Sequence, residues 1–390
     1  MKKLLLGTTA LVGASFAATA ALAAPEVRLG GYMDFQAGFS SQDVDGWSPS
    51  PGVPGVAGGD RGFGFVTDTE LLIRASDKLD NGLRWAVKIE MEADSQDRAV
   101  GTAKTNNEQN ADEVTMVFSG TWGELTLGNE DGPSDSMNMA ADSAISGLGL
   151  GASKGYRRWV NTTSFDNDLY TKVADVTDTN DATKVMYYTP TIAGFQFGVS
   201  YTANDGDSGR IRASDNAGAP TASQSQNYEN WIETGLTYEF KVDEIGFGLA
   251  ATYNHADAQN TTVTDDVNGY SLSGKVEFGG FLVSLGYASE NGVGDDKDVT
   301  VSGYGGGVKY TTGPYQIGVG YMHNMQDNPV GTAGGADFTS DTATLGVAYR
   351  LGAGVSLYAD SWYYTNDSDG FAPEDENQAI GLLVGTQITF

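Results

Sequence analysis

The sequence contains two sets of oppositely charged residues that could together form a site acting on a solute. Four cations share one parity of three alternating segments near the start of the chain: Arg28, Arg74, Arg84 and Lys88. Four acids lie in a later segment without alternation: Glu130, Asp131, Asp135 and Asp142. If that segment faces the cations, the two sets produce a transverse field that orients water and disfavours large apolar solutes. The alternative is ordinary salt bridges with acids of the same strand faces, namely Asp68, Glu70, Glu90 and Glu92.

The sequence offers little for catalysis or for a metal centre. It contains no Cys, so a thiolate zinc or iron–sulfur site is impossible, and only His255 and His323 supply imidazole. Both histidines fall where alternating segments meet long loops, so we expect exposed rim residues and not the buried His of a hydrolase triad. No enzyme activity, metal site or cofactor is expected. Acid-rich loops such as 295–298 leave open loosely bound divalent cations such as calcium.

Composition narrows the class of protein further. The 390 residues carry 22 basic and 51 acidic side chains, a net charge of −29, which leaves no basic surplus for nucleic acid. Aromatic residues make up 11% of the chain and Gly occurs 53 times. An acidic disordered chain would lack these aromatics, so a folded protein is expected.

The first residues are typical of an export signal. Lys2 and Lys3 precede an apolar stretch from Leu4 to Ala20, and Ala21-Leu22-Ala23 matches a signal-peptidase site. The prediction is a signal peptide over 1–23 and a mature chain over 24–390; the alternative is a membrane anchor. The mature chain would keep 20 basic and 51 acidic residues, a net charge of −31. No later segment has about 18 consecutive apolar residues, as a membrane helix requires.

Period-two alternation is the main structural signal of the mature chain. Val27, Leu29 and Met33 share one face of a segment whose other face carries Arg28 and Asp34. Sixteen such segments are found, near residues 26–39, 63–77, 83–94, 112–120, 124–130, 183–189, 195–203, 228–240, 245–254, 268–278, 281–289, 299–310, 315–323, 340–350, 355–364 and 378–390. Seven short turns alternate with eight long polar loops between them, which indicates an up-and-down meander.

This asymmetry of loops predicts an all-β fold, a 16-stranded antiparallel transmembrane β-barrel over 24–390. Several segments also begin and end with an aromatic residue six positions apart, as in Phe195–Tyr201 and Tyr315–Tyr321. After strand tilt, such rings fall toward the two edges of an apolar band of about 25 Å. The alternative is a β-sandwich with aromatic core residues, which would not require opposite faces so rich in Gly, Ser, Thr and charge.

The third long loop, about residues 130–182, is the segment that departs from the pattern. Loops of this length in a compact fold are usually functional or disordered. Its Met, Ala, Ile and Leu residues indicate that it packs against other parts of the protein. A barrel of sixteen strands is too wide for side chains to fill. We therefore expect this loop to fold into the lumen and to narrow it.

Several short motifs together resemble the Gram-negative general diffusion porins, with the alphaproteobacterial branch the most similar. They are the signal peptide, a Gly-x-Leu-x-x-Gly stretch at 123–128 before the third loop, Tyr-x-Thr-Pro at 187–190 and the terminal Phe390. The resemblance implies a homotrimer, a third loop inside each pore and a terminal segment, ending in Phe390, that the membrane-insertion machinery reads. The Pro-Glu-Phe-Gly loop tip of enterobacterial relatives is absent, so the resemblance does not place the acidic loop residues.

The expected protein is an outer-membrane porin of a Gram-negative bacterium, a water-filled channel for passive diffusion of ions and small hydrophilic solutes. Its acidic mature charge predicts a weak cation preference. Outer-membrane lipid and lipopolysaccharide are the expected surroundings, and no nucleic acid is expected as a partner. Three alternatives remain: a substrate-specific channel, an outer-membrane lipase or protease, and a soluble secreted adhesion protein. A run of aromatic residues on the inward faces would favour the substrate-specific channel, and the sequence shows no such run.

Overall fold

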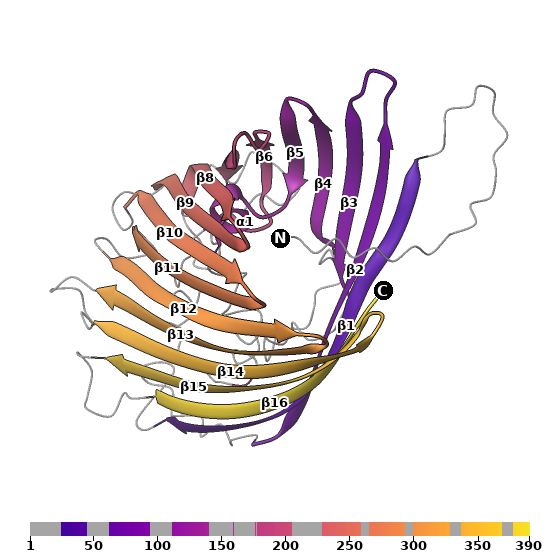
Figure 1. Ribbon diagram of the computed structural model, residues 1–390. Helices are drawn as coiled ribbons and strands as arrows, with labels where there is room; N and C mark the ends of the chain where they lie inside the picture. Colours follow the sequence, from indigo (N-terminus) through magenta and orange to yellow (C-terminus); the bar gives the residue numbers. More distant parts are fainter. Residues whose placement is uncertain are drawn as a thin grey trace, which may run out of the picture.

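Sixteen antiparallel strands close into one barrel in the computed structural model, which describes residues 25–44, 62–93, 111–139, 159, 176, 178–204, 228–258, 265–292, 299–327, 337–368 and 377–390 (Figure 1). Each strand pairs with its neighbours in the sequence, and β1 pairs with β16 to close the ring. The predicted 16-stranded antiparallel barrel is confirmed. The predicted signal peptide over 1–23 lies outside the described residues.

The elements follow the alternating segments of the sequence. They are β1 (Glu26–Val44), β2 (Gly64–Lys78), β3 (Arg84–Glu92), β4 (Ala111–Gly120), β5 (Gly123–Asn129), α1 (Pro133–Ser136), β6 (Thr183–Tyr188), β7 (Phe195–Asn204), β8 (Tyr228–Val242), β9 (Ile245–Ala258), β10 (Val267–Phe278), β11 (Phe281–Asn291), β12 (Thr300–Thr312), β13 (Tyr315–Asp327), β14 (Phe338–Gly352), β15 (Val355–Ser368) and β16 (Asn377–Thr389). No helix in these described parts is long and apolar enough to cross a membrane.

Several strands extend past the alternating segments. β1 runs to Val44, where alternation predicts an end near 39, and β9 runs to Ala258, four residues past the predicted end. The added residues are mostly polar, so their side chains give no alternation. Their backbone groups nevertheless continue the ladder with the next strand, because a neighbouring backbone offers them hydrogen-bond partners.

Seven short turns join the strands at the end of the barrel where β1 begins and β16 ends. One of the two-residue turns is Gly279-Gly280 between β10 and β11, where both residues have positive φ (53° and 87°). A type I′ hairpin turn needs this backbone conformation at both residues, and glycine adopts it without a steric penalty. All the long loops leave the opposite end, so the predicted sorting of short and long connections is confirmed.

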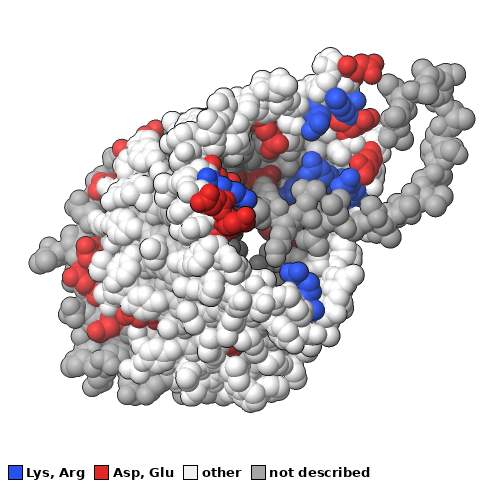
Figure 2. Space-filling view, in the orientation of Figure 1, with Lys and Arg blue, Asp and Glu red and all other residues white. Residues whose placement is uncertain are grey.

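The outer wall of the barrel is apolar. Along β1 the odd positions carry exposed Val27, Met33 and Phe39, whereas the even positions carry buried Asp34 and Gln36. Figure 2 shows much of this face as an uncharged surface, with acidic side chains along the left edge and charged side chains of both signs near the centre and at the upper right. A strand that presents apolar residues outward and polar residues inward fits a wall between lipid and an aqueous lumen.

Aromatic rings cluster toward the end of the wall with the short turns. Phe195 stacks on Tyr238 with 4.1 Å between ring centroids, Phe281 lies 4.4 Å from Tyr310, and Tyr315 lies 4.9 Å from Tyr349. The members come from neighbouring strands and therefore follow the circumference of the barrel. This arrangement fits an aromatic girdle at one edge of the apolar band.

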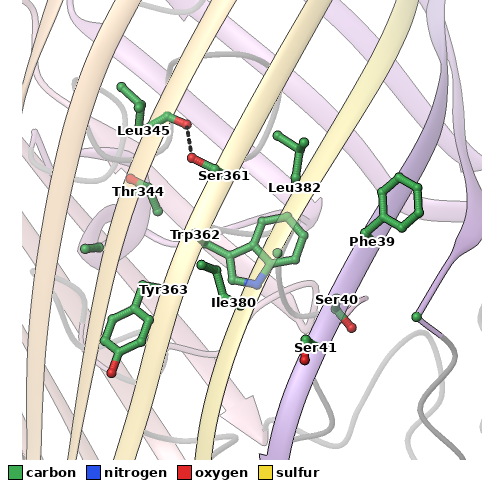
Figure 3. A pocket seen from close by; sticks show the side chains of 13 residues that line it. Phe39, Ser40, Ser41, Thr344, Leu345, Ser361, Trp362, Tyr363, Ile380 and Leu382 are labelled. Atoms are coloured by element: carbon green, nitrogen blue, oxygen red, sulfur yellow. Dashed lines mark hydrogen bonds between the residues drawn. The ribbon is translucent and has the colours of Figure 1, made fainter.

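A shallow apolar groove of about 770 Å³ crosses the outer wall over β14, β15, β16 and β1 (Figure 3). Exposed Phe39, Leu345 and Tyr363 surround smaller residues, including Ser41 and Ser361. The groove therefore belongs to the membrane-facing surface and not to the lumen.

Candidate functional site

Three of the four predicted cations form one row across the inner face of the barrel. Strand register pairs Arg28 of β1 with Arg74 of β2, and Arg74 with Lys88 of β3. Arg84 lies elsewhere: it pairs with Lys78, next to the short turn at 79–83. Arg28 donates a 2.8 Å hydrogen bond to Glu26 at the same end of the barrel. Lys88 contacts Glu130 at the start of the third loop.

Lys88 lies among three carboxylates. Its ammonium is 3.1 Å from Glu90 and 3.5 Å from Glu130, and it forms a short ion pair with Glu113. The Glu90 contact is one of the wall salt bridges left open by the sequence, and the Glu130 contact joins the wall to the loop. Sequence reasoning missed Glu113, although parity along 112–120 places it on the inward face beside Lys88. Three carboxylates therefore contact this one ammonium.

Both described ends of the third loop lie on the polar inner face of β6 to β10. Helix α1 packs against β7, β8 and β9 (Figure 1). The Met139 amide donates a 2.9 Å hydrogen bond to the Ser273 hydroxyl on β10. Met137 lies in a space provided by Gly198 and Gly235, where an added Cβ would lie 2.7 Å from its sulfur. Most of the loop, with the predicted acid Asp142, lies outside the described residues.

A buried lysine joins the two ends of the loop. Lys184 on β6 is 2% exposed, and its ammonium donates a 2.5 Å hydrogen bond to the Glu130 carbonyl at the start of the loop. It donates a second bond to the Asn180 carbonyl at the end of the loop. Backbone carbonyls from both ends therefore share one cation. Nothing in the spacing of the sequence pointed to this residue.

A buried carboxylate also joins the two ends of the loop, by accepting hydrogen bonds from both. Glu233 on β8 is fully buried and accepts a 2.7 Å hydrogen bond from the Ser134 hydroxyl of α1. Its other oxygen accepts bonds from the Thr179 hydroxyl (2.6 Å) and the Thr179 amide (3.2 Å). Hydrogen bonds to a buried charge are among the stronger ones in proteins. Glu233 and Lys184 together fasten the loop to the wall.

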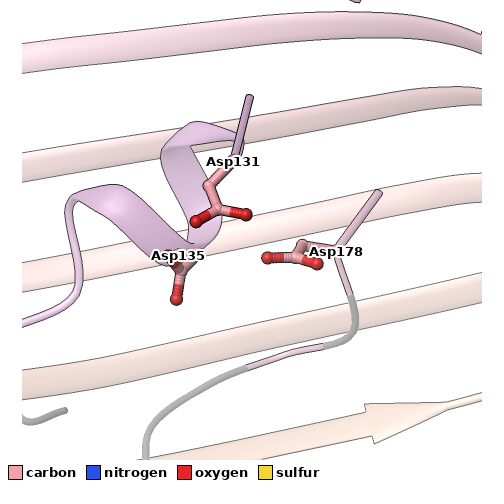
Figure 4. Close-up of side chains that lie close together, drawn as sticks. All are labelled: Asp131, Asp135 and Asp178. Atoms are coloured by element: carbon pink, nitrogen blue, oxygen red, sulfur yellow. The ribbon is translucent and has the colours of Figure 1, made fainter. Parts of the chain in front are cut away.

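Three further acids lie close together beside Glu233 and Lys184, the pair that we call the clamp. The carboxylate oxygens of Asp131, Asp135 and Asp178 lie within 4.8 Å of one another, and Figure 4 shows Asp131 and Asp178 facing each other. Such oxygens are ligands for calcium or magnesium, although three carboxylates supply only part of the six to eight ligands that calcium takes. Asp178 also accepts a hydrogen bond from the Asn180 amide at 2.8 Å.

This crowding changes the titration of the loop. Burial raises the pKa of the Asp178 carboxyl to about 7, and the nearby Glu233 and Asp131 carboxylates contribute to the rise. Burial likewise raises the pKa of Asp181 to about 7, with Asp112 as the next cause. The end of the loop therefore carries two acids that take up protons near neutral pH.

The two histidines are not free rim residues. His255 lies 3.0 Å from the Asn268 side chain and 3.4 Å from Asp257, and His323 lies 2.9 Å from Asp341. Both are half-buried within β9 and β13, so the predicted exposure was too high. The reason is that these strands continue past the alternating segments and flank the imidazoles.

Inward aromatics do exist on β15, contrary to the sequence analysis. Tyr358, Trp362 and Tyr364 occupy even positions on the inner face and are 5%, 3% and 0% exposed. They pack with Met322 and Leu383 in an apolar cluster. Because the rings are covered, they do not offer the exposed aromatic surface that would favour a substrate-specific sugar channel.

Comparison with known proteins identifies the family. Residues 7–369 match the family described as Gram-negative porin. An outer membrane porin protein of Bordetella pertussis is 25% identical over 428 residues, covering 98% of each chain. Outer membrane porin protein 32 of Delftia acidovorans is 27% identical over 353 residues, covering 83% of this chain and 86% of its own.

Solved structures agree on the fold. The anion-selective porin from Comamonas acidovorans matches 94% of this chain and 100% of its own with a TM-score of 0.61 at 18% identity. The trimer form of OmpT from Vibrio cholerae has the same coverage with a TM-score of 0.57 at 14% identity. With the matched family and the closed barrel together, the chain belongs to the Gram-negative porins, the outer-membrane channel proteins, and is not an enzyme.

Proposed function

We propose that this porin is a water-filled channel for passive diffusion of ions and small hydrophilic solutes, with a weak preference for cations. The observation that carries the cation preference is the surroundings of Lys88, where one ammonium lies among the carboxylates of Glu90, Glu113 and Glu130. Each ion pair neutralises one charge, so the remaining carboxylates keep the local potential negative. A wall of one sign concentrates counter-ions.

Two other features bear on the strength of this preference. The net charge of −29 favours cations throughout the lumen and its mouth. Arg74, which pairs with Lys88 in the strand register, and Arg84, next to the short turn at 79–83, are exposed and oppose the effect. The preference should therefore be modest. The similar porin from Comamonas acidovorans is described as anion-selective, and an anion preference here would be the opposite outcome.

We also propose that residues 130–182 narrow the lumen and that their acids belong to the constriction. Support comes from the contacts of Glu130 with Lys88 and of Ser134 with Glu233 on the inner face. Asp131 and Asp135 lie next to these anchors, which favours a place beside the aqueous path. Arg28, Arg74 and Arg84 complete the proposed basic wall.

Neutralising Lys88 tests the selectivity. Lys88→Gln should raise the cation-to-anion permeability ratio by about twofold, because three carboxylates then lack their shared cation. The ratio is measured as the reversal potential of the channel in a salt gradient. Arg350→Gln is the control, since Arg350 is exposed beside a short turn. A larger increase is expected for Arg84→Glu with Lys88→Glu, and an unchanged ratio would remove both residues from the constriction.

Assembly as a homotrimer is a further proposal, supported by the fold shared with the OmpT trimer. Phe390 is proposed as the insertion signal: it is 47% exposed on the outer wall, and its amide donates a 3.0 Å hydrogen bond to the Gly31 carbonyl of β1. Chemical crosslinking of purified protein should give a ladder that ends at three chains.

A further inference from the structure

The inner wall at β13, β15 and β16 carries an apolar cluster, although the inner face of the barrel is otherwise mostly polar. Trp362 and Tyr364 lie at its centre and are 3% and 0% exposed. Side chains on the inner face of a water-filled barrel are normally in contact with water or with other polar groups. Some apolar group must therefore cover them.

Trp159 of the third loop supplies part of that cover. Its indole packs against the cluster, and its carbonyl accepts a 2.7 Å hydrogen bond from the Ser40 hydroxyl of β1. The ring lies over two glycines: a Cβ at Gly38 would be 2.9 Å from Cζ2 of the ring, and one at Gly64 would be 3.3 Å from Cζ3. Neither glycine has a positive φ, so what they provide here is space for the indole and not a special backbone conformation.

The two ends of this part of the loop contact opposite sides of the ring of strands. Met139 is bonded to Ser273 on β10, whereas Trp159 is bonded to Ser40 on β1. In the closed strand order these two strands are separated by six strands in one direction and eight in the other. The chain from 139 to 159 therefore connects two distant points of the inner wall.

We propose that Trp159 is the distal anchor of the constriction loop, and that its seat on Gly38 and Gly64 sets the width of the opening that the loop leaves. This inference rests on the proposed function of residues 130–182 as the narrowing element. Trp159 acts through the loop and is a positioning residue. Losing its indole should let the loop occupy wider positions, which matters most for large solutes.

Solute size separates this role from a general loss of structure. Trp159→Ala should raise the permeability of liposomes to a trisaccharide by about twofold or more and leave that to a pentose nearly unchanged. Trp159→Phe should retain most of the parent behaviour, because a ring still covers the cluster. Trp122→Ala is the control: Trp122 is 44% exposed in the turn before β5, at the end of the barrel away from the long loops. Equal changes for both sugars would contradict the anchor.

A cysteine pair tests the contact directly, since the chain has no Cys of its own. Ser40→Cys with Trp159→Cys should form a disulfide on oxidation and return the trisaccharide permeability to the parent value, whereas reduction should raise it again. Ser271→Cys with Trp159→Cys should not crosslink, because Ser271 lies on β10.

The two hypotheses fail in different ways. If the Ser40 pair does not crosslink while the parent keeps its cation preference, the anchor is wrong and the proposed function stands. A different outcome is that the pair crosslinks but the permeability of both sugars is the same in the oxidised and the reduced protein. The loop then does not narrow the pore. That result overturns the proposed constriction and, with it, the role of Trp159 in setting its width.

Discussion

Glu233→Ala should release both ends of the third loop and is expected to have the largest effect of any single substitution considered. The change removes the acceptor of the Ser134 hydroxyl and the Thr179 amide in a fully buried place, whereas the Thr179 hydroxyl keeps its 3.2 Å contact with the Thr202 hydroxyl. Loss of hydrogen bonds to a buried charge costs about 3 kcal/mol in the docking of the loop. The population of undocked loop should therefore rise on the order of a hundredfold.

Hydrogen exchange of the Thr179 amide measures this docking, because that amide donates to Glu233 in the folded barrel. Glu233→Gln should exchange far more slowly than Glu233→Ala, since the amide oxygen still accepts the two bonds from Thr179. Glu239→Ala is the matched control on the same strand: Glu239 is 56% exposed and pairs only with Lys275 among the ion pairs of the described residues. Similar exchange in Glu233→Ala and Glu239→Ala would show that the carboxylate does not hold the loop.

The second large effect is a dependence of loop docking on pH. Asp178 and Asp181 have pKa values of about 7 in the docked loop and would have values of about 4 once the loop is free in water. Docking therefore takes up protons. Its stability is full below about pH 4 and is lost as the pH rises through 7.

Between pH 5 and pH 8 the undocked population should rise on the order of a hundredfold from Asp178 alone, and the less buried Asp181 carboxyl adds less because solvent screens it. The readout is exchange at Thr179, divided at each pH by the rate of an unstructured peptide. Asp178→Asn with Asp181→Asn should make this ratio nearly independent of pH, since neither amide titrates. A parent protein whose ratio stays flat, or a double variant that keeps the full dependence, would contradict the assignment to these acids.

Strand identity and facing could be predicted well from local pattern. The last segment shows why: Ile380, Leu382 and Val384 alternate with small or polar residues for most of its length, and they form an exposed apolar row on β16. The short turns could also be predicted, because turns such as Gly279-Gly280 adopt a backbone conformation that few other residues adopt. These signals depend on residues a few positions apart.

Contacts of the third loop could not be read in this way. The Ser40–Trp159 hydrogen bond joins residues 119 positions apart, and the Ser134–Glu233 bond joins residues 99 apart. The pattern of alternation also did not show which face of β15 is which, because both faces carry apolar or aromatic residues. Leu357 and Tyr363 point outward, and Tyr358 and Trp362 point inward. An inward aromatic residue is stable there because a distant tryptophan helps to cover it, and spacing along the chain carries no sign of that partner.

The contacts of Lys88 could likewise be predicted only in part. Parity along β3 places Lys88 and Glu90 on one face, which suffices to anticipate their 3.1 Å ion pair. The sequence suggested cations facing carboxylates across the opening, whereas Glu130 lies 3.5 Å from Lys88 on the same side. The start of the loop turns back onto the wall before the chain moves away, and the clamp formed by Lys184 and Glu233 explains that path.

Conductance across a planar lipid bilayer is the direct test of a water-filled channel with a weak cation preference. Purified, folded protein should give ohmic current steps, and the reversal potential in a potassium chloride gradient should have the sign of a weak cation preference. A folded barrel that conducts no current would contradict the water-filled channel. A clear anion preference would contradict the account of the acidic surplus around Lys88.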